Sequence, residues 1–322
     1  MAVIYNRSQL ERALRPEELI AAIEQGFIAY SQGKVIVPPV GELLFEEPPG
    51  DCHIKYGYVP GDPTFTIKVA TGFYRNAELG ISSSNGIILV FSTTTGQLIT
   101  ILDDEGFLTD ARTAAAGAVA AKLLAPAEVS RIGIIGTGIQ GKMQLDYLRY
   151  VLPARRAMVW ARSPEKAQSY QVDGFDIQVA GSIGDLAAAC NLIVTTTPSH
   201  RWLLGAADVR PGTHITAVGS DAAGKQELDP QLFLKAKVRA VDSRKQCVQY
   251  GDSSYAIKQG LIAAADLVEL GDIAQNPGLG RQSASEITIA DLTGVAVQDI
   301  QIAKLVVAAL GKPLTASAPL KP

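Results

Sequence analysis

The spacing of hydrophobic residues changes twice along the chain. Between 15 and 34, apolar side chains recur every three or four positions, with Pro16 suited to a first helical turn and Gly33 to a C-terminal stop, so this stretch predicts a helix. Between 52 and 104 apolar and polar residues tend to alternate, which indicates strands. From 131 onward, short continuous apolar runs alternate with helical segments, a pattern typical of a parallel sheet covered on both faces.

The alternating region predicts an antiparallel or mixed sheet with one apolar face. Lys55 and Lys68 fall on the other face, and the neighbours of Lys68 there are threonines. Residues 86–104 are expected to form a hairpin that turns near Gly96. Two interpretations of Lys68 remain open: it is a ligand for a substrate carboxylate, or a solvated charge at the rim of the sheet.

An alanine-rich stretch between 109 and 126 predicts a further helix, with Arg112 in its first turn. At that place the helix dipole and the guanidinium would both favour one substrate carboxylate. The alternative is a surface arginine paired with Asp103, Asp104 or Asp110. The last element, 284–310, ends in an amphipathic helix that we expect to return to the N-terminal half.

The segment RIGIIGTGIQGKMQ, residues 131–144, has the order strand, glycine loop, helix. Gly136 would permit the tight turn, Gly138 would let backbone N–H groups approach a pyrophosphate, and Gly141 would let the helix pack closely on the strand. The helix N-terminus adds a positive dipole for the phosphates. This context predicts a bound dinucleotide.

The segment VWARSPEKAQ, residues 159–168, bears on which dinucleotide binds. It carries Arg162, Ser163 and Lys166 and has no acidic residue directly at the expected strand end, where NAD enzymes usually hold the ribose 2′-hydroxyl. Arg162 with Ser163 could hold a 2′-phosphate, so the segment favours NADP(H) over NAD(H). Alternatively, Arg162 stacks on adenine or faces solvent.

Asp221 lies just beyond the carboxyl end of an expected parallel strand, where ligands of open α/β sheets collect. It could contact a substrate amine or relay a proton, or it could simply cap a turn. Residues 195–199 end the preceding strand and could line the nicotinamide ribose. The expected coenzyme contacts are Gly136, Thr137, Gly138, Ile139, Gln140, Gly141, Arg162, Ser163, Lys166, Thr196, Thr197, Pro198, Val218 and Gly219.

Composition narrows the classes of partner. The net charge of −3 is spread over mixed signs and leaves no footprint for nucleic acid or an anionic membrane. No apolar run reaches the 18 or so residues that span a bilayer. The three cysteines, Cys52, Cys190 and Cys247, have no metal-ligand or redox spacing, so we expect free thiols, no metal and a cytoplasmic protein.

Four motifs in order resemble the ornithine cyclodeaminase/mu-crystallin family: LTDARTAAAGAVAAKLLA, IGIIGTGIQGKMQL, AVGSDAAGKQELDP and SEITIADLTGVAVQDI. The resemblance covers nearly the whole chain. It implies an α/β fold with a Rossmann doubly wound parallel sheet at 126–295 and an N-terminal α/β substrate and dimerisation domain at 1–125. The C-terminal helix, about 296–322, would rejoin the first domain. The resemblance also implies a homodimer formed through the first sheet, and an active site in the cleft between the domains.

Position by position, Lys68 and Arg112 match the family's substrate-carboxylate residues, and Asp221 matches the catalytic acid near the substrate amine. WARSPEKA is similar to the NADPH-binding members. One departure lies in VPPVGELLF, residues 37–45, where many members carry another substrate-binding arginine. Glu42 could instead meet a cationic part of the substrate, and Lys55 or His53 could replace the lost positive charge.

The resemblance implies hydride transfer between nicotinamide and the α-carbon of an amino or imino acid. The leading hypothesis is an NAD(P)-dependent imine or ketimine reductase, or an L-amino-acid dehydrogenase, with Asp221 and Lys68 as catalytic residues. Arg112, Lys68, Lys55 and Glu42 would bind the substrate. The alternative is ornithine cyclodeaminase, which converts L-ornithine to L-proline and ammonia. A third reading is an NADPH-dependent binding protein like mu-crystallin.

Overall fold

The structure is a computed structural model that describes residues 2–311. The chain divides into two compact units, which are described separately: unit 1 comprises Met1–Arg112 and Val295–Pro322, and unit 2 comprises Thr113–Gly294. The division falls inside helix α3, Phe107–Leu124. The part of the expected last helix that covers 312–322 lies outside the described residues.

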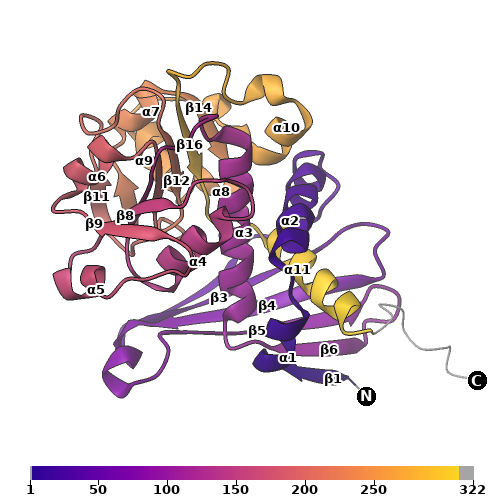
Figure 1. Ribbon diagram of the computed structural model, residues 1–322. Helices are drawn as coiled ribbons and strands as arrows, with labels where there is room; N and C mark the ends of the chain where they lie inside the picture. Colours follow the sequence, from indigo (N-terminus) through magenta and orange to yellow (C-terminus); the bar gives the residue numbers. More distant parts are fainter. Residues whose placement is uncertain (1, 312–322) are drawn as a thin grey trace, which may run out of the picture. The chain divides into compact units, whose positions relative to one another are not determined.

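Unit 1 is built on a six-stranded sheet in the order β1-β6-β5-β4-β3-β2 (Figure 1). Strand β1 is parallel to β6 and the other pairs are antiparallel, so the sheet is mixed, and the expected hairpin is formed by β5 and β6. The strands are β1 Val3–Asn6, β2 Gly41–Phe45, β3 Gly50–Tyr58, β4 Thr64–Phe73, β5 Ser84–Ser92 and β6 Leu98–Asp103. The helices are α1 Arg7–Ala13, α2 Pro16–Ser31 and α11 Ala296–Ala309, with a 3-10 turn at Tyr74–Leu79.

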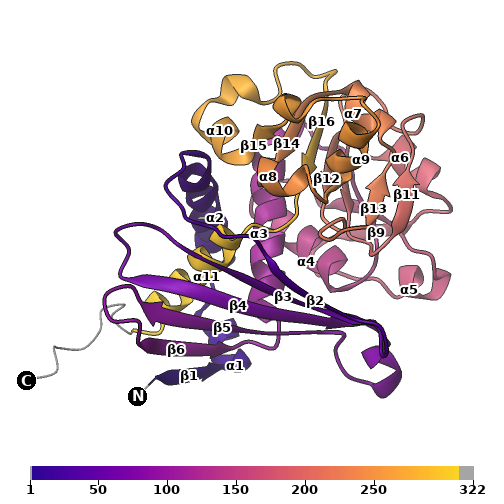
Figure 2. The same cartoon turned by 180° about the vertical axis from the view of Figure 1, so that it is seen from behind.

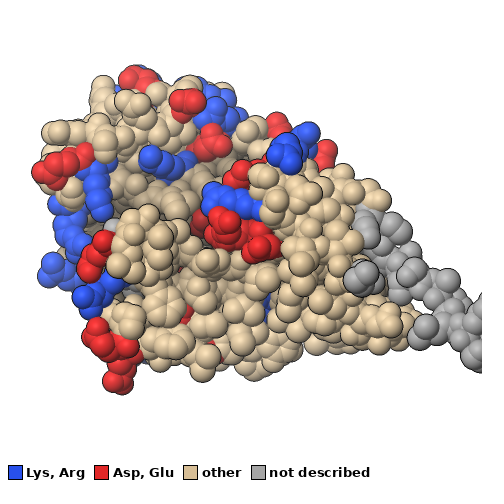
Figure 3. Space-filling model, turned by 90° about the horizontal axis from the view of Figure 1, so that it is seen from below, with Lys and Arg blue, Asp and Glu red and all other residues tan. Residues whose placement is uncertain are grey.

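The polar face of this sheet is its buried face. Helix α11 packs against β3 and β4, and Figures 1 and 2 show α2 and α11 on the same side of the sheet. Thr64, Thr66 and Lys68 are buried, whereas the alternate residues Phe65 and Ile67 keep part of their surface exposed. The view from below looks on to the side away from α11 and shows a broad area without charged side chains (Figure 3). The apolar face is therefore the outer one in the single chain.

Unit 2 contains an eight-stranded parallel sheet in the order β15-β14-β16-β12-β10-β7-β8-β9. Strands β9-β8-β7-β10-β12 follow the 3-2-1-4-5 part of the 3-2-1-4-5-6 order of a Rossmann sheet, which confirms the expected fold class, and β16, the last strand in sequence, is inserted between β12 and β14. The strands are β7 Ile132–Ile135, β8 Arg156–Trp160, β9 Asp176–Val179, β10 Leu192–Thr195, β12 His214–Ala217, β14 Ala236–Val241, β15 Val268–Glu269 and β16 Ile287–Asp291. Strands β11 His200–Leu204 and β13 Gln226–Leu228 form a separate parallel pair.

The remaining elements of unit 2 connect these strands. They are α4 Ile139–Leu148, α5 Pro164–Gln168, α6 Ile183–Ala189, α7 Gln231–Lys235, α8 Arg244–Cys247, α9 Asp252–Lys258, α10 Leu270–Gln275, and 3-10 turns at Ala264–Asp266 and Pro277–Leu279. Strand β16 was not singled out by the apolar pattern, although it lies between β12 and β14 in the middle of the sheet. No helix within the described residues is long and apolar enough to cross a membrane.

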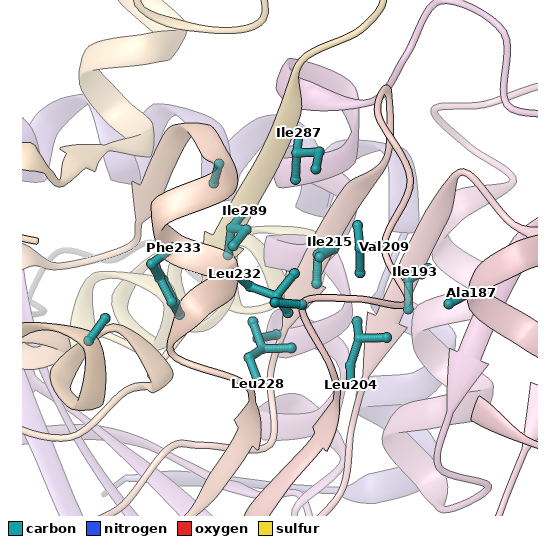
Figure 4. Packing of buried hydrophobic residues seen from close by; sticks show 14 of the residues in the cluster. Ala187, Ile193, Leu204, Val209, Ile215, Leu228, Leu232, Phe233, Ile287 and Ile289 are labelled. Carbon is teal, nitrogen blue, oxygen red and sulfur yellow. The ribbon is translucent and has the colours of Figure 1, made fainter. Parts of the chain in front are cut away.

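The core of unit 2 fixes the ends of the central strands. Ile193 of β10, Ile215 of β12 and Ile289 of β16 are completely buried and pack with Leu228, Leu232 and Phe233 (Figure 4). These side chains remove apolar surface from water on one face of the sheet. The loops at the carboxyl ends of these strands lie where a Rossmann sheet binds its ligand.

One polar residue in this interior makes folding sensitive to acid. His214 is fully buried, and its ring nitrogens lie 2.8 Å from Thr288 Oγ1 and 3.0 Å from Thr216 Oγ1. Burial, assisted by the nearby charge of Arg281, lowers the pKa of His214 to about 3. Because this value lies below the pKa of an unfolded histidine, the residue's contribution to stability is complete above about pH 6.5. It is lost as the pH falls toward the folded value.

We therefore predict a pH-dependent difference between the wild type and His214→Gln. The free energy of unfolding of the wild type minus that of the variant should shrink by about 2 kcal/mol between pH 7.5 and pH 5.0, because the unfolded wild type gains a proton there. Urea unfolding at the two pH values measures this difference, and subtraction of the variant cancels the contributions of carboxylates. A difference independent of pH would contradict the prediction.

Candidate substrate and coenzyme sites

Lys68 and Arg112 share one buried carboxylate in unit 1. Lys68 Nζ from β4 and Arg112 Nε from α3 each lie 3.1 Å from Asp299 Oδ1 on α11. Arg112 Nη1 also donates a 2.7 Å hydrogen bond to Gln298 Oε1. Lys68 is 1%, Arg112 5% and Asp299 1% exposed, so Lys68 is not a solvated rim charge and Arg112 is not a surface arginine paired with a neighbouring aspartate.

The position of Arg112 differs from the expected first turn of its helix. Helix α3 begins at Phe107, and the N–H of Leu108 donates to Asp104 Oδ2 at 2.7 Å. Arg112 therefore lies in the second turn, where the end of the helix dipole contributes little. The ion pair with Asp299 sets the position of Arg112. Asp104, which accepts the hydrogen bond at the start of the helix, is itself buried.

Lys55 adds a further buried positive charge beside this cluster. It lies on β3 directly opposite Lys68 in the β3–β4 register and is 9% exposed. Burial, together with the charges of Arg112 and Lys55, outweighs the attraction of Asp299 and lowers the pKa of Lys68 to about 7. Burial opposes ionisation of Asp299, but the three cations hold its pKa below the usual value. With Lys68 neutral, Lys55, Arg112 and Asp299 leave one positive charge in excess.

Asp299 was not among the sequence candidates, although it sits in a quoted family motif. Its signal is the polar pair Gln298 and Asp299 within an apolar stretch of the last helix, where both residues are 1% exposed. A charged residue buried on a helix needs a partner of opposite charge. That partner came from a different part of the chain, and the helical period alone does not identify it.

Glu42 lies on the same face of the sheet as the two lysines. It pairs with His53 in the β2–β3 register, and His53 Nε2 lies 3.1 Å from Glu42 Oε1. His53 Nδ1 lies 3.5 Å from Asp51 Oδ1. The structure thus places Glu42 and Lys55 on adjacent strands of one face, with Glu42 in contact with a histidine.

The glycine loop of unit 2 has the geometry that a dinucleotide requires. Gly136 has φ +116°, a conformation that side chains rarely adopt. A Cβ on Gly141 would lie 2.2 Å from Gly136 O, so only glycine allows this packing. A Cβ on Gly138 would meet no protein atom within 4 Å, which leaves open space at the N-terminus of α4. The loop therefore fits a pyrophosphate, with Thr137, Ile139 and Gln140 beside it.

The strand that follows brings Arg162 and Lys166 to the surface. Both side chains are exposed, at the start of α5. Ser163 is already engaged: its hydroxyl accepts from Lys166 N at 3.3 Å as the helix N-cap and donates to Glu165 Oε2 at 2.7 Å. An acid, Glu165, thus lies three residues beyond Arg162, although not at the strand end itself.

Asp221 and the remaining coenzyme candidates lie in the loops after β10 and β12. Asp221 is exposed and its Oδ1 lies 2.7 Å from Lys225 Nζ. Thr197 and Gly219, one from each loop, both donate backbone N–H groups to the buried carboxylate of Glu227, a residue that sequence patterns did not single out. Within the described residues, no group of three or more His, Cys, Asp or Glu is arranged to hold a metal ion.

The sequence matches the family model of the ornithine cyclodeaminase/mu-crystallin family over residues 2–312. The chain belongs to this family. Membership agrees with the paired features of the structure, a buried cation cluster in unit 1 and a dinucleotide loop in unit 2.

Several members of the family are similar to the chain over nearly all of its length. Alanine dehydrogenase of Archaeoglobus fulgidus is 33% identical over 307 residues, 94% of each chain. A solved archaeal alanine dehydrogenase dimer with bound NAD has a TM-score of 0.87 and 32% identity, and covers 96% of this chain and 95% of its own. Delta(1)-pyrroline-2-carboxylate reductase of Thermococcus litoralis, solved with NADH and L-proline, has a TM-score of 0.90 and 28% identity, with 95% and 97% covered.

The ion pairs of Asp299 lead to a prediction about stability. Asp299→Asn leaves Lys68 and Arg112 without a counter-charge in the interior, so the free energy of unfolding should fall by about 3–5 kcal/mol at neutral pH. Adding Lys68→Met to this variant removes one uncompensated cation and should restore part of the loss. Denaturant unfolding of the single and double variants gives the coupling between the two residues.

Asp62→Asn supplies the matched control. Asp62 forms an ion pair with Lys304, which also lies on α11, but the two side chains are 22% and 29% exposed. Solvent screening should limit its cost to about 1 kcal/mol or less. Equal losses for Asp299→Asn and Asp62→Asn would contradict the assignment of a buried charge cluster.

Proposed function

We propose that the chain is an NAD(P)-dependent oxidoreductase that transfers hydride between nicotinamide and the α-carbon of an amino or imino acid. The observation that carries this proposal is the buried set of Lys68, Arg112 and Asp299, with Lys55 opposite Lys68. Evolutionary relatives that are named as reductases or dehydrogenases of amino and imino acids support it. When bound, nicotinamide supplies or accepts the hydride.

The charge of the cluster suits a substrate with one carboxylate. Arg112 can offer a planar guanidinium to a carboxylate, and Lys55 adds a second positive charge on the same face. Asp299 neutralises part of this charge and holds Arg112 and Lys68 from one side. An excess of one positive charge, with Lys68 neutral, would then be compensated by one substrate carboxylate.

Lys68 is suited to move a proton as well as to bind. Because its pKa is lowered to about 7, both the ammonium and the free amine are populated near neutral pH. We assign Lys68 the exchange of a proton with the substrate nitrogen or with water held beside it. Asp221 is assigned a proton relay at the substrate amine, which its place after β12 and its match to the family's acid support.

The alternative, ornithine cyclodeaminase, is supported less well by the same face of the sheet. Ornithine carries a second ammonium on its side chain, and Lys55 lies buried opposite Lys68 where such a group would meet like charge. Glu42 is the residue that could offset this repulsion, but it is exposed and lies beside His53. The binding-protein reading comes third, since Lys68, Arg112 and Asp221 are all present.

For the coenzyme, the proposal is NADP(H) in preference to NAD(H). Exposed Arg162 and Lys166 flank the start of α5 and could pair with a 2′-phosphate. The relatives solved with NAD or NADH show that other members of the family bind the unphosphorylated coenzyme. The preference thus depends on Arg162 and Lys166 in this chain.

For assembly, the proposal is a homodimer through the outer face of the six-stranded sheet. Tyr56 is 38% exposed there, and Ile67 and Phe65 keep part of their surface open. Apolar patches of this kind mark association surfaces. The archaeal alanine dehydrogenase named above is a dimer, which supports a dimeric state. The three cysteines are free, which supports the proposed cytoplasmic location.

A test of the activity compares the wild type with Arg112→Lys. With NADPH and α-imino acids such as pyrroline-2-carboxylate, or with α-keto acids plus ammonia, we expect net oxidation of the coenzyme, measured by its absorbance. Arg112→Lys keeps the charge but loses the planar pair of donors, so kcat/KM for the imino acid should fall about 10- to 100-fold. The KM for the coenzyme should not change.

Arg12→Lys, an exposed position on α1, is the control and should behave as the wild type. Formation of proline and ammonia from ornithine without net coenzyme turnover would contradict the proposal in favour of cyclodeamination. Tight coenzyme binding without turnover on any of these substrates would favour the binding-protein reading.

A second test concerns the 2′-phosphate. Arg162→Ala should raise the dissociation constant for NADPH about tenfold, because one charge-assisted contact is lost, and leave that for NADH within about twofold. Fluorescence titration of both coenzymes measures the two constants. Arg156→Ala serves as the control, because Arg156 is exposed at the start of β8, whereas Arg162 follows the end of that strand. Equal effects of Arg162→Ala on both coenzymes would contradict the preference for NADP(H).

A further inference from the structure

Glu227 of β13 joins two loops of unit 2 through a single buried carboxylate. It is 0% exposed, and its two oxygens accept four hydrogen bonds. Oε1 accepts from Thr197 N at 2.5 Å and from Thr197 Oγ1 at 2.7 Å. Oε2 accepts from Thr195 Oγ1 and from Gly219 N, both at 2.7 Å. The carboxylate thus uses both oxygens to tie the end of β10 and the loop after it to the loop after β12.

The two loops approach each other as closely as their backbones allow. A Cβ on Gly219 would lie 2.1 Å from Thr197 O and 2.6 Å from Glu227 Cδ. No side chain fits at Gly219. The backbone pairing of β10 with β12 continues to the hydrogen bond from Val218 N to Thr195 O, and beyond it the Glu227 carboxylate links the two loops.

Two further buried acids, Asp252 and Asp291, accept hydrogen bonds from the backbone next to Glu227 and from the start of α9. Asp252 Oδ1 accepts from Glu227 N and Leu228 N, both at 2.8 Å, so it fixes the backbone of β13. Asp291 accepts from Asp252 N at 3.2 Å and from Ser253 N at 2.8 Å. The other oxygen of Asp252 is buried without a hydrogen-bond partner. Burial, together with the charges of Asp291 and Glu227, raises the pKa of Asp252 well above its usual value.

Burying three acids side by side is costly unless their position is needed. A neutral side chain of similar shape, such as glutamine, has only one oxygen and could not accept from donors on both sides. The arrangement accordingly holds the loops at the expense of burying charge. Those loops contain residues 195–199, which were expected to line the nicotinamide ribose, and the further expected coenzyme contacts Val218 and Gly219.

We propose that Glu227 is a positioning residue for the nicotinamide half of the coenzyme, which it serves by holding the loops after β10 and β12 at one spacing. The inference rests on the proposed function, because it needs a dinucleotide on this sheet. In the 3-2-1-4-5-6 order, the glycine loop after β7 serves the adenylate half, and β10 and β12 belong to the other half. The four hydrogen bonds accepted by the Glu227 carboxylate come from Thr195, Thr197 and Gly219, which belong to β10 and to the loops after β10 and β12.

The test compares two ligands that differ only by the nicotinamide riboside: the reduced dinucleotide that the wild type binds more tightly, and the matching ADP-ribose or 2′-phospho-ADP-ribose. Glu227→Gln should raise the dissociation constant of the dinucleotide about tenfold or more, because the amide NH2 that replaces one oxygen cannot accept, so that either Thr197 N or Gly219 N loses its acceptor. It should leave that of the ADP-ribose ligand within about twofold. Calorimetric or fluorescence titration of the full-length protein gives both constants.

Two further variants make the comparison independent of a general loss of folding. Glu227→Asp keeps the charge but is one methylene shorter, so it should weaken dinucleotide binding in the same direction and to a smaller extent. Asp229→Asn is the matched control, because Asp229 follows β13 and accepts from Ala206 N at 3.1 Å and Gln231 N at 2.9 Å, away from the coenzyme loops. It should change the affinity for neither ligand.

Hydrogen exchange of the ligand-free protein supplies a readout that needs no coenzyme. The amides of Thr197 and Gly219 should lose protection in Glu227→Gln, whereas that of Ile193, inside β10, should not. Equal weakening of both ligands, or no change in either, would overturn the positioning role. A wild type that binds neither ligand would overturn the proposed function itself and this inference with it.

Discussion

The burial of a lysine in the sheet of unit 1 imposes the strongest constraint on the chain. A charged amine in an apolar interior needs a counter-charge, and Lys68 forms its ion pair with Asp299 near the C-terminal end of the described chain. Arg112 depends on the same carboxylate. Unit 1 is therefore assembled from both ends of the sequence, and helix α11 is held on the sheet by charge as well as by its apolar residues.

The need to pair buried charges also explains why the polar face of this sheet is buried and its apolar face is partly exposed. A polar face would ordinarily meet water, but here threonines and lysines lie under α11 while the aromatic and aliphatic face is only half covered. Such an arrangement is stable when the polar groups find partners inside and when the apolar face has a use outside. Substrate chemistry and self-association would then occupy opposite faces of one sheet.

Local patterns in the sequence predicted much of the fold. The glycine spacing predicted the strand, glycine loop and helix at 131–144, the alternating region predicted the hairpin, and the short apolar runs predicted most of the parallel strands, because these features depend on neighbours along the chain. The expected return of the last helix to the first half agrees with the contact between α11 and β3. The apolar pattern did not predict strand β16, because its five residues precede a helix with a similar apolar content.

Only part of the candidate site could be predicted from the sequence, for a physical reason. Lys68 and Arg112 stood out as isolated charges, but Asp299 and Glu227 derive their roles from partners that are distant in sequence. Arg112 was expected to depend on a helix dipole and depends on an ion pair instead. The spacing of residues along the chain indicates candidate catalytic and binding residues, whereas the ion pairs and hydrogen bonds of buried charged groups are seen only in the folded structure.

The buried acids of unit 2 also affect how the protein responds to protons. Burial raises the pKa of Glu227, Asp252 and Asp291, and that of Asp291 to about 7, so the folded chain retains on Asp291 a proton that an unfolded chain would release between about pH 4 and pH 7. This linkage makes folding more favourable as acidity increases, while His214 acts in the opposite sense over much of the same range. The Rossmann unit thereby contains two opposed titrations, which would flatten its stability profile across the mildly acidic range.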